Sequence, residues 1–382
     1  MMNKVYFART PDYSLDTVYD SVKSILLYYG MDKMVSAEAT ILLKPNMLSR
    51  SVPDKAVTTH PAVVDAVMKA LTEMGAKAEN ITIADSGGGP SNPALNAASY
   101  KTCGYTDVAV KYGAKVYTKY ETVTVKTDGV MVKEFELLEP VVNSDIVINL
   151  AKFKTHVMTG MSAAVKNLFG CVPGLKKAEF HMRFPDKEPF SAMMVDLCQT
   201  VNPTLTIVDA VTGMEGDGPG SGNPVYLGML VAGDNPYYTD LAVCNMMGFD
   251  PMHPPIMAQA INRGLVPDKL PQDCIRGDTD LYAKLENFAL PHSYRIDFGD
   301  RVPRALRWAT PTVEKFLAPK PKIKKAACIG CGKCHDICPG NAIKIVNKKA
   351  IIDYNKCIKC FCCHEMCPVK AIDVKRSIFF NI

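Results

Sequence analysis

Two short runs of cysteine near the C-terminus have the residue types and spacing of a metal site. They read, in order, Cys328-x2-Cys331-x2-Cys334-x3-Cys338-Pro339 and Cys357-x2-Cys360-x2-Cys363-x3-Cys367-Pro368. Soft thiolates are the ligands that iron–sulfur clusters use, and this spacing is typical of chains that hold a pair of [4Fe–4S] clusters. The sequence therefore predicts two [4Fe–4S] clusters.

The fourth cysteine of each run is expected to bind the cluster of the other run. This rule assigns one ligand set to a site that we call cluster A: Cys328, Cys331, Cys334 and Cys367. It assigns the remaining ligands to cluster B: Cys357, Cys360, Cys363 and Cys338. A zinc site would use cysteines in pairs without a third in each run, and disulfides suit secreted chains.

Cys362 is one cysteine more than the repeat requires. The spacings from Cys360 to Cys363 and from Cys363 to Cys367 are regular without it. We interpret Cys362 as a spare thiol beside the cluster, and exchange with a neighbouring ligand is the alternative.

The C-terminal residues 326–382 resemble the bacterial two-cluster ferredoxin family. The halves of this segment repeat, because Ala342-Ile343 and Ala371-Ile372 follow their cysteine runs at matching offsets. The resemblance implies a small α+β ferredoxin-like domain with two clusters. We expect it to follow an α/β domain over residues 1–310 and a Pro- and Lys-rich linker over residues 311–325.

The composition of the 382-residue chain is that of a globular protein, with 48% hydrophobic and 22% charged residues. Its other cysteines are scattered, which is typical of a reducing compartment. The N-terminus shows no apolar signal segment, and no apolar run approaches the roughly 18 residues that span a bilayer. We therefore expect a soluble cytoplasmic protein without a membrane partner. The oxygen sensitivity of exposed clusters indicates an anaerobic source.

The net charge of +5 is concentrated at the C-terminus, where residues 326–382 hold nine basic and four acidic side chains. We interpret this excess as compensation for the negative charge of the cluster thiolates. Nucleic acid is the alternative partner, but no aromatic interleaving or nucleic-acid motif accompanies the lysines. The sequence therefore predicts no nucleic-acid partner.

The N-terminal part alternates between predicted strands and helices. Val- and Ile-rich segments predict strands at 4–8, 40–44, 80–84, 145–150, 204–209 and 226–231. Apolar residues at helical spacing predict helices over 15–29, from Pro61 to Gly75, over 159–169 and over 236–247. This order is typical of an α/β fold with a mostly parallel sheet and helices on both faces. Residues 115–136 predict a hairpin that turns at Asp128-Gly129.

Polar side chains follow four of the predicted strands, at the edge where open α/β sheets bind ligands. Lys152, Lys154 and His156 alternate along one extended stretch, so we expect them to share a face that suits a carboxylate, phosphate or enolate. The residues to which we assign catalytic roles are Lys152, Lys154, His156, Asp209 and Glu215. Those to which we assign substrate binding are Lys44, Asn46, Asp85, Ser86, Lys166, Asn167 and His181. A solvated basic edge is the alternative for the lysines.

The glycine-rich stretch Gly87-Gly88-Gly89 follows a predicted strand and could cradle a phosphate through backbone N–H groups. A flavin or nucleotide cofactor is therefore a further hypothesis. The stretch lacks the GxGxxG and GxxxxGK[ST] patterns, so formation of a turn is the alternative.

Seven segments together resemble the DUF362 family, a group named for its unknown function. They are KPN (44–46), DSGGGP (85–90), LAKFKTH (150–156), TGMSAAVKNLFG (159–170), PGLKKAEFH (173–181), DAVTGMEGDGP (209–219) and GDNPYYTDLAV (233–243). The resemblance implies an α/β domain, iron–sulfur clusters and redox work, and it supplies no catalytic residues.

The sequence leads to two functional hypotheses. In the first, the protein is an iron–sulfur oxidoreductase that passes single electrons from an external donor such as ferredoxin to a small substrate with an anionic or carbonyl group. In the second, it is a non-catalytic electron-transfer or cluster-delivery protein whose α/β domain docks a partner. An enclosed pocket with Lys152, Lys154 and His156 pointing inward would favour the first, and a flat surface the second.

Overall fold

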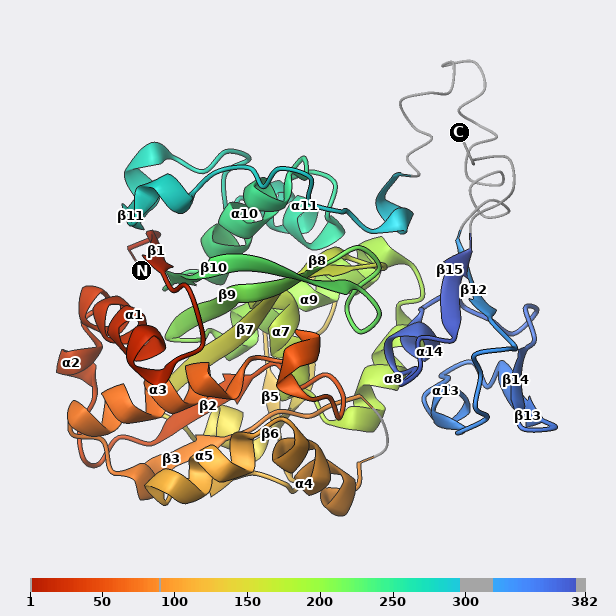
Figure 1. The fold of residues 1–382 in the computed structure, drawn as a ribbon, viewed down its shortest axis with the longest axis horizontal. Helices are drawn as coiled ribbons and strands as arrows, with labels where there is room; N and C mark the ends of the chain where they lie inside the picture. Colours follow the sequence, from red (N-terminus) through yellow and green to blue (C-terminus); the bar gives the residue numbers. More distant parts are fainter. Residues whose placement is uncertain (1, 89–90, 296–318, 376–382) are drawn as a thin grey trace.

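A central sheet of nine strands organises the N-terminal part of the computed structural model, which describes residues 2–88, 91–295 and 319–375 (Figure 1). The strand order is β11-β1-β10-β9-β7-β2-β3-β4, and β8 pairs with β7. The strands are β1 (Val5–Arg9), β2 (Ile41–Pro45), β3 (Ile81–Ile83), β4 (Lys115–Val116), β7 (Ile146–His156), β8 (Gly160–Ser162), β9 (Leu205–Glu215), β10 (Asn223–Gly233) and β11 (Ile275–Gly277). The prediction of a mostly parallel sheet is confirmed, because the antiparallel pairs are those of β10 with β1 and β9 and of β8 with β7.

Helices cover both faces of this sheet, as predicted. Alternate strand residues point to opposite sides, so Leu42 belongs to one apolar core while Ile41 and Leu43 belong to the other. The core around Ile41 is covered by α1 (Leu15–Tyr28), α3 (Pro61–Glu73), α4 (Pro93–Thr102) and α5 (Tyr105–Tyr112). The core around Leu42 is covered by α7 (Ala164–Asn167), α9 (Lys187–Val201), α10 (Pro236–Met247) and α11 (Pro255–Asn262). The other α-helices described in this part of the chain are α2 (Met31–Met34), α6 (Glu139–Val142) and α8 (Gly174–Arg183).

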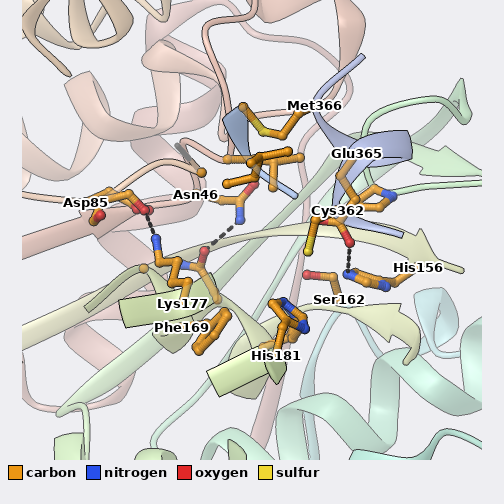
Figure 2. Close-up of a pocket in the computed structure, with 18 of the residues that line it drawn as sticks. Asn46, Asp85, His156, Ser162, Phe169, Lys177, His181, Cys362, Glu365 and Met366 are labelled. Carbon is orange, nitrogen blue, oxygen red and sulfur yellow. Dashed lines mark hydrogen bonds and ion pairs between the residues drawn. The ribbon is translucent and has the colours of Figure 1, made fainter. Parts of the chain in front are cut away.

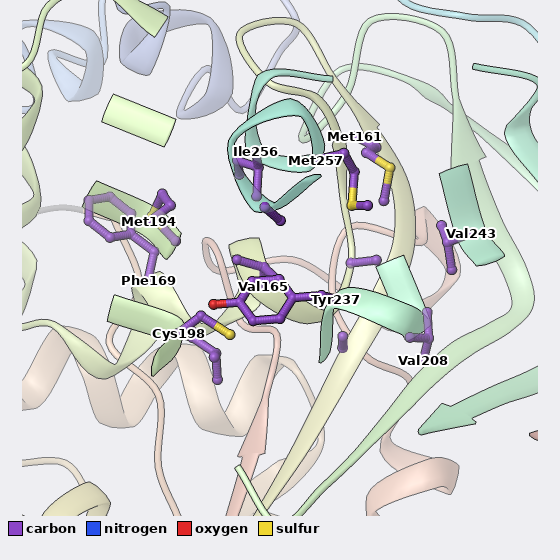
Figure 3. Packing of buried hydrophobic residues seen from close by; sticks show 14 of the residues in the cluster. Met161, Val165, Phe169, Met194, Cys198, Val208, Tyr237, Val243, Ile256 and Met257 are labelled. Carbon is purple, nitrogen blue, oxygen red and sulfur yellow. The ribbon is translucent and has the colours of Figure 1, made fainter. Parts of the chain in front are cut away.

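The core on the α9–α10 side holds the short helix α7 in place. Val165 of α7 packs near Tyr237 of α10 and Cys198 of α9 (Figure 3). The carboxylate of Asp240, also on α10, accepts hydrogen bonds from the N–H groups of Ala164 at 2.7 Å and Val165 at 3.0 Å. These bonds satisfy backbone donors at the start of α7, which carries two residues of the predicted site.

One predicted helix is wrong. Residues 159–169 form strand β8, helix α7 and the beginning of a 3-10 turn, η3 (Leu168–Cys171). Gly160 adopts a φ of +76°, and Ala163 lies at φ −148° and ψ −119°, so the backbone leaves the helical region twice. Strands β7 and β9 also extend beyond their predicted ends at 150 and 209, because β8 and β10 pair with their continuations.

The predicted hairpin within 115–136 is confirmed as an antiparallel pair, β5 (Thr122–Lys126) with β6 (Glu134–Leu138). Among the described residues, no helix is both long and apolar enough to cross a lipid bilayer.

The C-terminal segment forms a small α+β unit, which we call the cluster module (residues 319–375 of the described chain) (Figure 1). Strand β12 (Lys320–Ile323) pairs with β15 (Ile372–Lys375), and β13 (Ile343–Val346) pairs with β14 (Lys349–Ile352). Two single-turn helices, α13 (Lys333–Asp336) and α14 (Cys362–Glu365), follow the cysteine-bearing turns. Of the predicted linker 311–325, residues 311–318 lie outside the described residues, whereas 320–323 belong to strand β12 rather than to a linker.

Candidate functional site

The cysteines of the two runs gather around two small hollows in the cluster module. One hollow is lined by the four cysteines assigned to cluster A, Cys328, Cys331, Cys334 and Cys367. The other is lined by the four assigned to cluster B, Cys338, Cys357, Cys360 and Cys363. The fourth cysteine of each run therefore lies with the first three of the other run, as the exchanged pattern requires.

Backbone N–H groups point at several of these sulfur atoms. Ala342 donates to Cys338 Sγ at 3.2 Å, and Ala371 donates to Cys367 Sγ at 3.1 Å, at the same offset in the two halves. Ala350 donates to Cys328 Sγ at 3.4 Å. Such donors stabilise thiolates and tune iron–sulfur centres. Four thiolates around each apolar hollow, with N–H groups aimed at the sulfur, fit a [4Fe–4S] cluster.

Replacing Cys338 with serine is expected to remove cluster B and to lower the iron content from about eight to about four atoms per chain. Iron analysis of anaerobically prepared protein measures this loss. The matched control is Cys362→Ser, which should keep about eight atoms because Cys362 is outside both ligand sets. A drop in iron in the Cys362 variant would show instead that this thiol is a ligand.

A cleft separates the cluster module from the carboxyl edge of the large sheet (Figure 2). It is lined from the sheet side by Asn46, Asp85, Ser86, Lys154, His156, Ser162, Lys166, Asn167, Phe169, Lys177 and His181, and from the module by Ile337, Cys362, Glu365 and Met366. Its volume of about 80 Å³ compares with the roughly 10–15 Å³ that one water requires, so the cleft has room for a small ligand.

Direct contacts fix the cluster module over the cleft. His156 Nε2 lies 3.3 Å from Glu365 Oε1, His364 Nε2 lies 3.1 Å from the carbonyl oxygen of Asp217, and Lys370 Nζ donates to the carbonyl of Gly222 at 2.9 Å. Gly220 permits this approach, because a Cβ atom there would lie 2.6 Å from the carbonyl oxygen of Glu365. The glycine-rich loop after β9 is therefore used for close contact between the two parts of the chain.

Three lysines point toward the cleft without a carboxylate partner in the described chain. Lys154 Nζ donates to Asn46 Oδ1 at 2.6 Å and to the carbonyl of Val57 at 2.9 Å. Lys177 Nζ, on helix α8 (Gly174–Arg183), donates to the carbonyl of Ser86 and, at 3.2 Å, to that of Gly87. Lys166 Nζ lies 5.0 Å from the ring centroid of Phe169. The cleft therefore concentrates positive charge.

Burial dominates the electrostatics of these lysines, and the carboxylates of Glu365 and Asp85 offset its effect only in part. Burial lowers the pKa of Lys154 to about 7, and repulsion from Lys166 lowers it further. Burial likewise lowers the pKa of Lys177 to about 7, and burial lowers the pKa of Lys166. Since an opposite charge at the same place would favour the ammonium form, the cleft is suited to an anion.

Two buried histidines complete the cleft. His156 Nδ1 accepts a hydrogen bond from the N–H of Met158 at 3.1 Å, so its proton lies on Nε2, which faces Glu365. Burial lowers the pKa of His156 well below its usual value. His181 stacks on Phe190, and its buried Nδ1 has no hydrogen-bond partner within the described residues. Burial lowers the pKa of His181 to about 3, so both rings are neutral.

The structure brings most of the predicted substrate-binding residues to this cleft. Those that line it are Asn46, Asp85, Ser86, Lys166, Asn167 and His181. Lys44 does not line it, but its Nζ forms a buried ion pair with Asp85 Oδ2 at 2.9 Å. Asn167 Oδ1 accepts from Asn46 Nδ2 at 2.8 Å, so the two amides orient each other behind Lys154.

The predicted catalytic residues divide into two groups. Lys154 and His156 line the cleft, whereas Lys152, Asp209 and Glu215 do not. Asp209 accepts hydrogen bonds from Lys152 Nζ at 2.7 Å, from the Tyr13 hydroxyl at 2.8 Å and from the His60 N–H at 2.8 Å, which ties the sheet to the segments that lead into α1 and α3. Glu215 lies at the far end of the extended strand β9, where its Oε2 accepts from the N–H of Ala289 at 2.9 Å.

Lys177, Cys362 and Glu365 line the cleft but were not among the predicted site residues. Lys177 precedes the predicted residue His181 by one helical turn on α8, a spacing that places both on one face. Cys362 was visible as the cysteine outside the repeat, and Glu365 follows it three residues later on α14. Helix α14 faces the sheet because of contacts between the cluster module and the rest of the chain, so the local sequence does not show this orientation.

The glycine-rich loop after β3 fits a phosphate poorly. The N–H of Ser86 donates to the carbonyl of Gly170 at 2.9 Å, and the N–H of Gly88 donates to that of Leu48 at 2.7 Å. These donors are used within the protein, and residues 89–90 lie outside the described chain. The hypothesis of a flavin or nucleotide at this loop gains no support from its geometry.

Comparison with known proteins gives matches over both parts of the chain. A family model described as a domain of unknown function (DUF362) matches residues 41–245, and a 4Fe-4S dicluster domain matches residues 327–375. The thylakoid-associated protein sll1697 of Synechocystis is 30% identical over 320 residues, which cover 80% of this chain and 93% of that protein. Similarity to the lactate racemase apoprotein of Thermoanaerobacterium thermosaccharolyticum has a TM-score of 0.40 at 13% identity and covers 63% of this chain and 56% of the racemase. The chain thus belongs to the DUF362 family and carries a C-terminal 4Fe-4S dicluster domain.

Proposed function

We propose that this protein is an iron–sulfur reductase whose active site is the cleft between the sheet and the cluster module. One observation carries the proposal: the unpaired lysines Lys154, Lys166 and Lys177 surround a cavity whose opposite wall includes Cys362. Cys362 stands between Cys360 and Cys363, two ligands of cluster B. A substrate in this cavity would therefore be held by cations while it lies beside a redox centre.

The size and charge of the cleft define the class of substrate. A cavity of about 80 Å³ admits a ligand of a few heavy atoms or one end of a larger molecule. Ammonium groups with depressed pKa values favour carboxylates and other oxyanions, because the anion replaces the missing countercharge. We infer a small oxyanionic substrate, or one that presents such a group to the cleft.

The residues of the chain would bind the substrate and supply protons. When bound, the clusters supply single electrons; reduction of a C=C or C=O bond consumes two electrons and two protons. Lys154 is the better proton donor, because its pKa of about 7 lies near neutrality, whereas His156 is a neutral ring. His156 instead donates its Nε2–H toward Glu365 and keeps this wall of the cleft in place.

The alternative of an electron-transfer or cluster-delivery protein without a substrate gains less support. A docking surface would leave its polar side chains in water, whereas Lys154 is 1% and His156 2% exposed. A buried lysine without a carboxylate partner destabilises a fold, so its position in the wall of a cavity favours a ligand over a surface contact.

The proposal is tested by reducing the loaded protein anaerobically with dithionite, removing the excess and adding small unsaturated carboxylates and 2-oxo acids. We expect return of the visible absorption of the oxidised clusters together with a product that has gained two electrons and two protons. Slow reoxidation at the same rate with and without every compound, and no product, would overturn the proposal.

A further inference from the structure

The two cluster sites differ in their surroundings. Three residues on the cleft wall directly precede predicted ligands: Cys362 and Ile337 precede Cys363 and Cys338 of cluster B, and Met366 precedes Cys367 of cluster A. Among the ligands of cluster A, by contrast, Cys331 is exposed, and its neighbour Ile329 is 60% exposed. Cluster B therefore adjoins the cleft at two ligands and cluster A at one, whereas cluster A has the exposed ligand Cys331 and so presents an edge to the surroundings of the module.

An exposed patch borders the hollow of cluster A. We call it the entry patch and define it by Ile329, Cys331, Lys333, Lys348 and Val369. Ile329, Cys331, Lys333 and Val369 line the hollow itself. Lys348, at the turn between β13 and β14, adjoins Gly330, where a Cβ atom would lie 2.3 Å from the Lys348 carbonyl oxygen. Two apolar side chains and the exposed Lys333 thus line the hollow, and the backbone of the exposed Lys348 adjoins it.

The charge around the entry patch is strongly positive. Residues 319–375 hold twelve lysines and four carboxylates. One carboxylate, Glu365, lies in the cleft, and another, Asp373, pairs with Lys324 at 2.7 Å. Asp336, on the same helical turn as Lys333, offsets part of this charge, and the module keeps an excess of lysines. Such a surface attracts an acidic partner and steers its approach.

We propose that the entry patch docks an acidic one-electron carrier, and that electrons enter at cluster A and leave through cluster B toward the cleft. Each docking oxidises the carrier by one electron and reduces the module by one, so two dockings deliver the pair of electrons that one substrate consumes. Docking and entry are independent of the cleft, and only the last step rests on the proposed function. The apolar side chains of Ile329 and Val369 would form the water-excluding part of the contact with the carrier, and the lysines would surround it.

An anionic membrane surface is the other partner that a lysine-rich patch with apolar tips could bind. The placement of the patch favours the carrier, because its residues border the exposed edge of a redox centre. A patch that bound only a membrane would not need to border a redox centre.

The test is the rate at which a reduced plant-type [2Fe–2S] ferredoxin, an acidic carrier, reduces the loaded protein in a stopped-flow experiment. The variant is Lys333→Glu with Lys348→Glu. At low ionic strength its second-order rate constant should fall about tenfold or more, and the decrease of the rate with added salt should disappear. Iron content should stay near that of the unchanged protein, which excludes a lost cluster. The added negative charge should lower the midpoint potential of cluster A, but that change does not depend on salt in the way docking does, so the loss of the salt dependence is the result that identifies docking.

The matched control is Lys33→Glu with Lys77→Glu, which makes the same change in net charge on exposed lysines of the large domain. Helix α2, which carries Lys33, lies on the side of the molecule away from the module (Figure 1). Equal rate constants for the two double variants would overturn the proposal. So would loss of binding to phosphatidylglycerol vesicles by the patch variant at an unchanged carrier rate, which would assign the patch to a membrane. Fast reduction by the carrier without substrate turnover would contradict the proposed reductase function but would still support the proposal that the carrier docks at the entry patch.

Discussion

Replacing Lys177 with methionine is expected to weaken the binding of small oxyanions in the cleft by about 1.5–3 kcal/mol, or roughly ten- to 150-fold. The substitution keeps the length and the apolar stem of the side chain and removes one of the ammonium groups that surround the cavity. Calorimetric titration of the loaded protein with acetate, sulfate and inorganic phosphate measures the effect. Absence of binding of all three anions to the unchanged protein would contradict an oxyanion site.

The neighbouring Lys176 offers the matched control for this substitution. It lies on the same helix, but its Nζ pairs with Glu136 at 3.0 Å and Glu179 at 3.1 Å on the surface. Lys176→Met should leave the affinity for oxyanions nearly unchanged. If both variants bind with equal affinity, the cleft is not where the anion sits.

The affinity of the cleft for oxyanions is expected to depend on pH. Burial holds the pKa values of Lys154 and Lys177 at about 7, and a bound anion favours their protonated forms. Binding should therefore take up protons, and the affinity should fall as the pH rises above about 7. Titrations in buffers with different heats of ionisation measure the proton uptake.

Replacing Asp209 with alanine is expected to lower the free energy of unfolding by about 3–5 kcal/mol, because it leaves the ammonium of Lys152 buried without its partner. Asp209 and Lys152 are both buried, and the carboxylate also holds Tyr13 and the N–H of His60. Denaturant unfolding of the loaded protein, monitored by far-ultraviolet circular dichroism, measures the change. As a control, Glu121→Ala breaks the exposed pair with Lys119 and should cost less than about 1 kcal/mol.

A double variant separates the contribution of this ion pair from that of the other hydrogen bonds of Asp209. Lys152→Met combined with Asp209→Leu removes both charges, and it should recover part of the stability lost in Asp209→Ala. A double variant as unstable as Asp209→Ala would show that the hydrogen bonds to Tyr13 and His60 dominate instead.

The grouping of the eight cysteines around two hollows could be predicted from the sequence because it follows from a local spacing. The carboxyl edge of the sheet was also predictable, because β2, β3 and β7 pair in parallel. Asn46 and Asp85 follow β2 and β3, and His156 is the last residue of β7. Strand β9 departs from this rule. It continues beyond Asp209 because β10 pairs with it up to Glu215, and the extra length carries Glu215 away from the cleft.

The far wall of the cleft could not be predicted in the same way. Glu365 meets His156 because the cluster module packs against the sheet, and no periodicity within either segment specifies that contact. The helix expected over 159–169 failed for a related reason. Its apolar spacing reflects burial between β7 and α10, while Gly160 and the Asp240 carboxylate determine where α7 begins.

The most direct test of a shared site for substrate and redox centre compares the midpoint potentials and EPR signals of the two clusters in reduced, loaded protein. The comparison is made with and without an oxyanion whose binding has been measured by calorimetry. We expect the anion to lower the potential and shift the signal of cluster B, because added negative charge beside a cluster disfavours its reduction. The shift should persist in Cys331→Ser, which disturbs cluster A, and disappear in Cys338→Ser and in Lys177→Met. An anion that binds tightly yet changes neither cluster would contradict a cleft in which substrate and redox centre meet.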